Sequence, residues 1–244
     1  MAKVILYMWD SIENRRGVLA NLPLFDATFS FDPLSSRHYG MQLRPLFFSK
    51  GFAQPPQESF DYHLSFVGTA HTDRYGVISQ LRQRLNPALS TYWFLYLQAP
   101  WVFHAYRLMQ PSMRSARRED FSFRPLDKTT VQSIFARSRA VLDIEHPLQR
   151  GLTMRTFETM GSHKKLITTN AQVRDYDFFN PDNICVIDRH APIVPADFLG
   201  SPYSLLPQAV YERYSIAGWL DEIMGPEYQG LGENRHDRSP NGIG

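Results

Sequence analysis

Short apolar runs alternate with amphipathic segments along the first fifty residues. Within each run the apolar residues are nearly continuous, which is typical of strands buried on both faces of a parallel sheet. Asp32 followed by Pro33 predicts a helix start, because Asp caps free N–H groups and Pro fits the first helical position. We therefore expect strands over 3–9, 27–31 and 43–48, joined by helices over 11–25 and 32–40.

A polar stretch with two prolines, residues 49–61, interrupts this pattern and predicts a linker. The alternation then resumes, but it is lost again over 101–124, where we expect an irregular segment. Asp127 is a plausible cap for one of the later helices. Further strands are expected over 62–68, 91–98, 140–144, 165–169 and 184–188, with helices over 72–85, 127–138, after Gly151 and near 214–224.

Strands joined by helices predict the α/β class, with two Rossmann-like units of parallel sheet. We assign residues 1–54 to a partial N-terminal unit, 55–225 to a C-terminal unit, and 226–244 to a disordered tail rich in Gly, Asn, Arg and Pro. Three parallel strands make a poor domain without more partners. The first unit is therefore expected to be incomplete: the chain begins partway through a fold or borrows an edge from another molecule.

Composition narrows the classes of function. A hydrophobic share of 43% with 20% charged residues is typical of a globular protein, and the net charge of +2 gives no reason to expect a nucleic-acid partner. The single cysteine, Cys185, fits a reducing compartment. The longest apolar stretch, 92–106, is too short and interrupted to cross a bilayer, which needs about 20 apolar residues. We expect a cytoplasmic protein, either soluble or peripheral at the inner membrane.

Ligands of open parallel sheets bind at the carboxyl ends of the strands, so polar residues that follow a strand are the first candidates. The segment FVGTAHTDR ends a strand with Gly68, where the backbone can approach a ligand closely, and continues with Thr69, His71 and Arg74. The Arg74 guanidinium can contact a phosphate. The alternative is a tight turn whose polar residues cap the next helix.

The second candidate segment is GLTMRTFETMGSHKKLITTN. Gly151 precedes a helix whose first turn, near Leu152 and Thr153, presents unpaired N–H groups to an anion such as pyrophosphate. Arg155 and Glu158 are three residues apart, and the Glu158 side chain leans back toward the helix start. There a carboxylate can accept hydrogen bonds from two ribose hydroxyls, while Arg155 pairs with phosphate. The alternative is a surface ion pair worth a few tenths of a kcal/mol.

Two residues are candidates for catalysis. Asp10 ends the first strand and would face the same cleft from the other unit, a position suited to a general base; the alternative is a helix cap. His71 is the second candidate. No histidine or acidic pair has metal-ligand spacing, so no metal site is predicted. The arginines between Arg107 and Arg124 can meet anionic lipid headgroups, although a solvated irregular segment is the alternative we favour.

Three segments carry a resemblance to a known family. FVGTAHTDR, VLDIEHPLQRGLTMRTFETMGSHKKLITTN and NICVIDR look like the C-terminal half of bacterial glycosyltransferases of the GT-B fold. The nearest group is that of the CgeB-like spore-maturation transferases, which is linked to lipopolysaccharide or capsule biosynthesis. YMWDSIENRRG and FDATFSFDPLSSRHYGMQLRPLFF resemble the last strands of that group's N-terminal domain, whose first part has no counterpart here. The likeness covers residues 3–224 and is strongest over 141–190.

The resemblance implies a nucleotide-sugar donor against the C-terminal unit and a glycan or lipid-linked acceptor against the N-terminal one. It implies that Glu158 holds the ribose, that Gly151 to Arg155 meet the diphosphate, and that Gly68 to Arg74 form the loop beneath. No metal or other cofactor is implied, and the helix dipole and arginines would stabilise the leaving diphosphate. Many retaining relatives carry two glutamates here, and the earlier one falls at Arg150, which leaves the stereochemistry open.

We therefore predict a metal-independent glycosyltransferase that moves a sugar from a nucleotide-sugar donor to a lipopolysaccharide, capsule or other cell-surface glycan. The incomplete first unit motivates an alternative, a catalytically inactive protein that binds the nucleotide sugar or serves as a scaffold. A NAD-dependent oxidoreductase is disfavoured, because no glycine fingerprint follows any strand.

Overall fold

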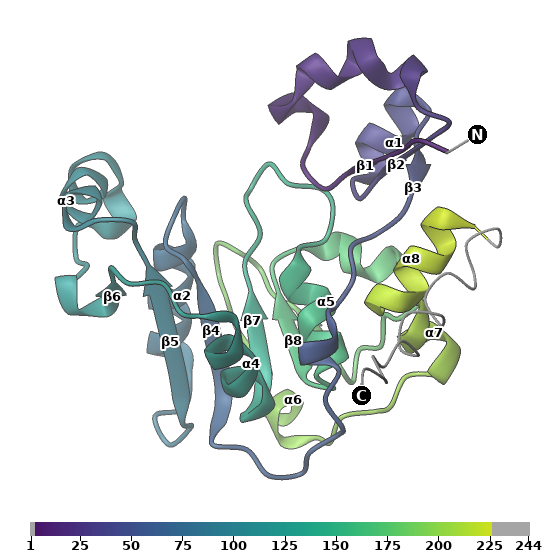
Figure 1. Ribbon diagram of the computed structural model, residues 1–244. Coiled ribbons are helices and arrows are strands. Elements are labelled where there is room, and N and C mark those ends of the chain that lie inside the picture. The colour runs from purple at the N-terminus through teal and green to yellow at the C-terminus, as the bar shows by residue number, and fades with distance from the viewer. Residues whose placement is uncertain (1–2, 226–244) are drawn as a thin grey trace, which may run out of the picture.

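The computed structural model describes residues 3–225 and contains two parallel β-sheets (Figure 1). The smaller sheet has the order β1-β2-β3 and the larger one the order β6-β5-β4-β7-β8-β9. This architecture confirms the predicted α/β class with two Rossmann-like units. The predicted disordered tail, 226–244, lies outside the described residues.

The strands are β1 (Ile5–Met8), β2 (Ala27–Ser30), β3 (Gln42–Leu43), β4 (Tyr62–Thr69), β5 (Thr91–Tyr96), β6 (Phe121–Ser122), β7 (Ser138–Asp143), β8 (Lys165–Thr168) and β9 (Ile184–Val186).

The larger sheet is built outward from its centre. From β4 the chain adds β5 and β6 on one side, then returns to add β7, β8 and β9 on the other, so the strand order reverses between β4 and β7. Ligands of such sheets bind at the carboxyl ends of the strands, beside this reversal. The helices are α1 (Pro33–Tyr39), α2 (Arg74–Arg84), α3 (Pro100–Met109), α4 (Lys128–Ala136), α5 (Met154–Gly161), α6 (Ala196–Gly200), α7 (Gln208–Arg213) and α8 (Ile216–Met224).

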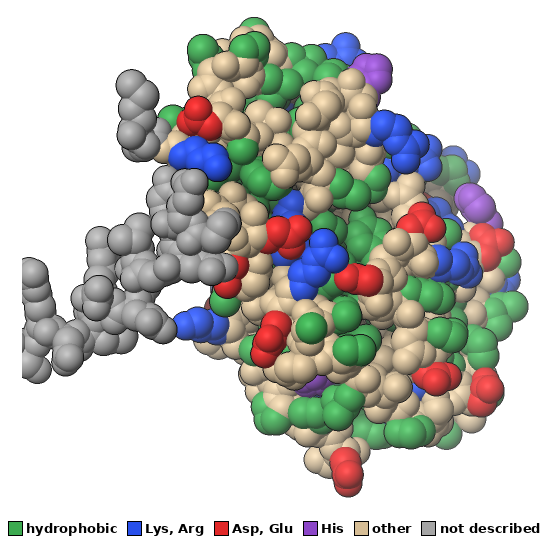
Figure 2. Space-filling model, turned by 90° about the vertical axis from the view of Figure 1, so that its right-hand side faces the viewer, with side chains coloured by type: hydrophobic (Ala, Val, Ile, Leu, Met, Phe, Trp, Pro, Cys, Tyr) green, Lys and Arg blue, Asp and Glu red, His purple; other side chains and the backbone are tan. Residues whose placement is uncertain are grey.

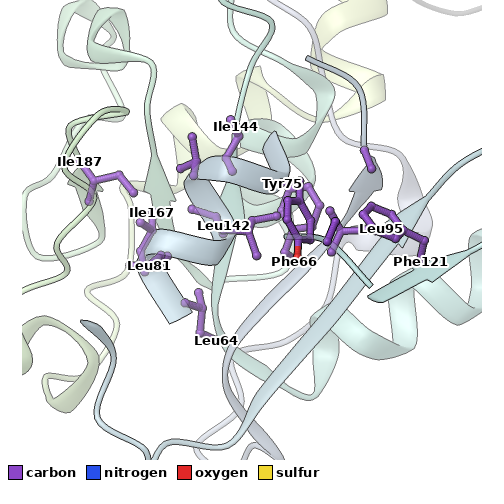
Figure 3. Close-up of a cluster of buried hydrophobic side chains, with 14 of the residues drawn as sticks. Leu64, Phe66, Tyr75, Leu81, Leu95, Phe121, Leu142, Ile144, Ile167 and Ile187 are labelled. Carbon is purple, nitrogen blue, oxygen red and sulfur yellow. The ribbon is translucent and has the colours of Figure 1, made fainter. Parts of the chain in front are cut away.

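Both faces of the larger sheet are buried, as the continuous apolar runs predict. Leu142 of β7 and Ile167 of β8 belong to the cluster covered by α2 (Figure 3). Their neighbours Val141 and Leu166 belong to the cluster on the opposite face, which α5 covers with Phe157. Successive side chains of each strand point to opposite faces of the sheet, so each face has its own core. The two cores together hold the strand ends in fixed positions.

The C-terminal helix α8 returns to the smaller sheet and links the two units (Figure 1). Trp219 of α8 packs edge-on against Tyr7 of β1, with ring centroids 4.7 Å apart. Arg44, which follows β3, is fully buried; its Nε lies 3.0 Å from a Glu222 carboxylate oxygen, and its Nη2 donates to the Arg213 carbonyl. The face that carries α7 and α8 shows acidic and basic side chains interspersed among its described residues (Figure 2).

Caps and most strands follow the sequence pattern. The Asp32 carboxylate accepts hydrogen bonds from two N–H groups of α1, and the Asp127 carboxylate accepts one from Thr130 of α4. Pro33 occupies the first turn of α1, as expected. The boundary between residues 54 and 55 stays a prediction: the two sheets lie on either side of it, but Phe52 is buried in a core of the larger unit.

Three expected elements differ in the structure. The α-helix expected over 11–25 is two 3₁₀ segments, Ile12–Asn14 and Arg16–Leu24. The second contains Pro23, and its apolar residues Val18, Leu19 and Leu22 are only partly buried against the core of the smaller unit. The strand expected over 43–48 pairs with β2 only at Gln42–Leu43, and Pro45 offers no N–H to prolong it. Phe48 instead forms an isolated parallel bridge with Ser215. Further 3₁₀ segments are Lys50–Phe52, Pro111–Met113, Arg118–Asp120 and Ala171–Asp175.

The segment expected to be irregular, 101–124, begins with a regular helix. Pro100 occupies the first turn of α3, and Val102 and Phe103 pack into the core of the larger unit. Aromatic residues on both sides of the helix hid its 3.6-residue period in the sequence. Between residues 3 and 225 no helix combines the length and apolar character needed to cross a membrane.

Candidate functional site

A cavity of about 410 Å³ opens at the carboxyl ends of β4, β5 and β7, beside the point where the strand order reverses. Its opposite wall is the first two turns of α5. Two segments that are about eighty residues apart in the sequence therefore meet here. Six of the eight residues predicted to bind the donor line this cavity: Gly68, Thr69, Arg74, Thr153, Arg155 and Glu158.

On the β4 side, Arg74 holds two strand ends together. Its Nε donates to the Ile144 carbonyl at 2.7 Å, and its Nη1 donates to the Thr69 carbonyl and hydroxyl at 3.1 and 3.0 Å. The other terminal nitrogen, Nη2, makes no hydrogen bond to the described residues. Gly68 is required sterically, because a Cβ there would lie 2.9 Å from the Phe66 ring. Arg74 thus both shapes the cavity and presents positive charge to it.

On the α5 side, a buried carboxylate fixes the start of the helix. Thr153 is the N-cap, and its hydroxyl oxygen accepts hydrogen bonds from the N–H groups of Arg155 and Thr156. The same hydroxyl donates to Asp143 Oδ2 at 2.6 Å, and the Thr156 hydroxyl donates to the same oxygen at 3.0 Å. Asp143 ends β7 and is 4% exposed, and this burial raises the pKa of its carboxyl group. The contacts lock the helix start to the strand end.

Arg155 and Glu158 form an ion pair on the cavity wall. Arg155 Nη1 lies 3.0 Å from Glu158 Oε2, and the guanidinium sits over the Phe135 ring at 4.9 Å. The side chains are only 23% and 17% exposed, so the pair is not the freely solvated surface contact that was the alternative. Burial raises the pKa of the Glu158 carboxyl group, and the Arg155 charge opposes this effect. The pair presents both a cation and hydrogen-bond acceptors to a ligand.

Gly151 and Leu152 do not line this cavity. A Cβ on Gly151 would lie 2.6 Å from the Phe31 ring and 2.9 Å from the Phe31 carbonyl oxygen, so this glycine allows close contact with the smaller unit. Leu152 is 2% exposed and packs in the core beneath α5. Their predicted contact with a diphosphate stays a prediction.

A second cavity, of about 630 Å³, lies between the two units. Asp10 and Trp9 line it from the smaller unit, and His146 lines it from the loop after β7. Thr153 and Met154 line both cavities, so the two lie next to each other at the start of α5. A molecule bound between the units would therefore approach a ligand of the first cavity.

Asp10 is held by its own segment. Its Oδ1 accepts hydrogen bonds from the Ser11 N–H at 2.8 Å and from Asn14 Nδ2 at 2.9 Å. Arg15 Nε lies 3.6 Å from its second oxygen. Ser11, not Asp10, is the N-cap residue of the following 3₁₀ segment, which corrects the capping alternative.

His71 lies outside both cavities but beside His146, with ring centroids 6.1 Å apart. Burial, together with the positive charge of Arg74, lowers the pKa of His71 to about 4. His71 is therefore neutral near pH 7 and can accept a hydrogen bond. Asp10 and His146 line the cleft directly, whereas His71 lies behind His146 and does not line it.

Several residues that shape the site escaped the sequence analysis. Asp143 is the last residue of β7, and this position at a strand end is the only feature of the sequence that could have marked it as a site residue. Arg189 donates to both carboxylate oxygens of Asp73, at 2.8 and 2.9 Å, and pairs with the buried Glu145. Asp73 makes no side-chain cap on α2, which corrects the helix-cap alternative for this turn.

Within residues 3–225, no cluster of three or more His, Cys, Asp or Glu residues has a metal-binding arrangement.

Comparisons with known proteins support the fold alone. No protein-family model and no curated protein sequence matches the chain. Two crystal structures of Anabaena Alr3699/HepE, in complex with UDP and glucose and with UDP-glucose, are similar, with TM-scores of 0.60 and 0.57. Each is 11% identical and aligns over 90% of this chain and 70% of its own. The GtfA/B complex matches 85% of this chain with a TM-score of 0.42 and 12% identity, too low to carry an argument.

Proposed function

We propose that the chain binds a nucleotide sugar in the 410 Å³ cavity and transfers its sugar to an acceptor bound between the two units. One observation carries the proposal: residues predicted from two distant segments converge on one cavity at the carboxyl ends of β4 and β7. The fold is shared with HepE, whose structures are described as complexes with UDP-glucose and with UDP and glucose. The narrower resemblance, to the CgeB-like group with a lipopolysaccharide or capsule acceptor, stays a prediction.

The donor would lie along α5. Arg155 and the positive end of the α5 dipole supply positive charge for the diphosphate, since the N–H groups of Arg155 and Thr156 already donate to the Thr153 hydroxyl. The Glu158 carboxylate accepts hydrogen bonds from ribose hydroxyls. As the bond to the sugar breaks, negative charge builds on the leaving diphosphate. The helix start, Arg155 and the unbonded Nη2 of Arg74 are positioned to stabilise that charge. We propose that these groups suffice without a metal ion.

The acceptor, a glycan or a lipid-linked glycan, would lie in the 630 Å³ cleft. Asp10 is the proposed base, because it lines the cleft from the smaller unit and keeps one oxygen largely free of hydrogen bonds. His71 is the second candidate from the sequence, but its pKa of about 4 makes the neutral imidazole a weak base, so its proposed role is to accept a hydrogen bond. Asp10→Asn should leave donor binding unchanged and lower transfer by at least about 100-fold, the lower range of general-base contributions.

A transfer assay separates the enzyme from the alternative, an inactive binding or scaffold protein. The purified chain is incubated with a panel of UDP-, GDP- and dTDP-sugars, and nucleotide release is followed with and without glycan acceptors. The proposed enzyme releases nucleotide from at least one donor, and Asp10→Asn or His71→Ala slows that release. Tight donor binding with neither transfer nor hydrolysis, in wild type as in both variants, would establish the inactive protein instead.

We also propose peripheral contact with an anionic membrane through α3. Trp101, Leu108 and Met109 are 71%, 83% and 78% exposed, and exposed arginines, including Arg107 and Arg114, lie beside them. Apolar side chains flanked by cations suit the interface of an anionic bilayer. This helix lies at the far end of the larger sheet from α8 (Figure 1).

Vesicle sedimentation tests this contact. The chain should sediment with phosphatidylcholine vesicles that contain one quarter phosphatidylglycerol, and less with pure phosphatidylcholine. The double variant Trp101→Ala, Leu108→Ala should lose most of this binding. Leu24→Ala is the control, because Leu24 is 74% exposed on the smaller unit. Equal sedimentation of the double variant and the control would contradict the contact.

A further inference from the structure

A third cavity, of about 380 Å³, lies at the amino ends of β7 and β8. The proposed donor site lies at the opposite, carboxyl ends of the strands. One wall is the linker between the sheets, from Pro56 to Phe60, and another is the segment from Pro202 to Leu205. Its volume falls within the range of small-molecule sites. Neither the donor nor the acceptor of the proposed transfer reaches it, so its chemistry needs a separate account.

Lys164 lines this cavity with a side chain that makes no hydrogen bond or ion pair to the described residues, and its Nζ keeps access to the open cavity. The residue is only 4% exposed. The next residue, Lys165, shows how the fold otherwise satisfies a buried ammonium: its Nζ donates to the Asp182 and Phe198 carbonyls and to the Ser201 hydroxyl. Burial of an unpaired charge is unfavourable. For Lys164 it lowers the pKa of the amine to about 8.

Other side chains make the same cavity positive. Arg139 sits over the Phe60 ring at 4.9 Å and donates from Nη2 to the Gly200 and Ser201 carbonyls, which leaves its remaining N–H groups without described acceptors. His163 also lines the cavity, and its Nδ1 is buried without a hydrogen-bond partner. Burial lowers the pKa of His163, so this side chain adds a polar group but no positive charge near pH 7. The acidic lining is limited to Glu58, which is exposed on the linker.

We propose that this cavity is a second ligand site, which takes a small organic anion with an apolar body. The carboxylate or phosphate group would accept hydrogen bonds from Lys164 and Arg139. Hydrogen bonds between a cation and an anion are stronger than those between neutral groups. The apolar body would pack along Phe60, Tyr203 and Leu205, which line the same cavity. The proposal concerns binding alone and does not depend on glycosyl transfer.

Calorimetric titration of the full chain tests the site with benzoate, phenyl phosphate and the neutral analogue benzamide. Benzoate or phenyl phosphate should bind wild type, and the stronger of the two identifies the anion class. Lys164→Met should weaken that binding at least ten-fold, and benzamide should not bind. Lys50→Met is the matched control, because Lys50 is exposed and away from the cavity. The titrations are repeated with Arg155→Ala, which should leave binding unchanged and so exclude the donor site.

Arg139→Gln gives an independent reading if Lys164→Met fails to fold, and it should also weaken binding at least ten-fold. The proposal is overturned if neither anion binds wild type at millimolar concentration. It is equally overturned if binding is unchanged in whichever of the two variants folds, or if Arg155→Ala abolishes it.

Discussion

Replacement of Lys164 by methionine should stabilise the protein near pH 7. Methionine keeps a flexible stem of similar length and removes the ammonium group of a side chain that is 4% exposed and makes no hydrogen bond to the described residues. The surrounding charges offer little compensation, because Arg139 and Lys165 are cations and the single acidic residue of the lining, Glu58, is exposed on the linker. Replacing buried charge by an apolar group of similar shape is often stabilising for this reason.

The size of the effect follows from the pKa of the amine. Burial lowers it from 10.5 to about 8 in the folded chain. At about 1.4 kcal/mol per pKa unit, the gap corresponds to at most about 3 kcal/mol. Below pH 8 the amine is protonated in both states, so the folded state carries the whole cost. Between pH 8 and 10.5 the unfolded chain binds a proton that the folded chain does not, so wild-type stability rises with pH.

Urea unfolding followed by circular dichroism, at pH 7, 8, 9 and 10, measures this directly in buffers free of carboxylate and phosphate. Lys164→Met should exceed wild type by about 1–3 kcal/mol at pH 7. The difference should shrink steadily above pH 8. Lys50→Met should track wild type throughout, because Lys50 is exposed. A Lys164→Met variant that is no more stable than wild type at pH 7, or a difference independent of pH, would refute the reasoning.

Two further substitutions probe how the site is built. Gly151→Ala places a Cβ 2.6 Å from the Phe31 ring, so thermal unfolding should show a loss of about 1–3 kcal/mol. Gly17→Ala, with open space around it, should change stability by less than about 0.5 kcal/mol, and equal effects would contradict the packing argument. Asp143→Ala removes the acceptor of the Thr153 and Thr156 hydroxyls and should cost about 1–3 kcal/mol in urea unfolding, with weaker nucleotide binding. Unchanged stability and affinity would show that this carboxylate does not position α5.

The strands and the donor-side residues could be predicted because each has a local signal. A continuous apolar run marks a strand buried on both faces, and Gly68, Arg155 and Glu158 lie close to predicted strand ends or helix starts. Local patterns fail where the partner is distant in sequence. The close contact of Gly151 with Phe31, 120 residues earlier, is one such feature, while its predicted contact with a diphosphate stays a prediction.

Two other misses have the same physical origin. Asp143 shapes the site because the fold brings the end of β7 beside the start of α5. No spacing pattern in the sequence predicts that contact. Lys164 has no local signal in the sequence, because its low exposure and its place in the third cavity are visible only in three dimensions. The helix α3 was missed because Trp101 and Leu108 face outward, which masks the usual contrast between an apolar and a polar side.

The most direct test of the account is calorimetric titration of the chain with nucleotide sugars, beginning with UDP-glucose. The account predicts that at least one donor binds wild type, and that Arg155→Ala and Glu158→Ala each weaken it at least about ten-fold, since loss of a charged hydrogen bond costs about 1.5–3 kcal/mol. The exposed residues Arg37 and Glu119 supply matched controls, and their alanine variants should bind like wild type. Absence of binding by wild type across the donor panel, or unchanged affinity in both site variants, would contradict the account.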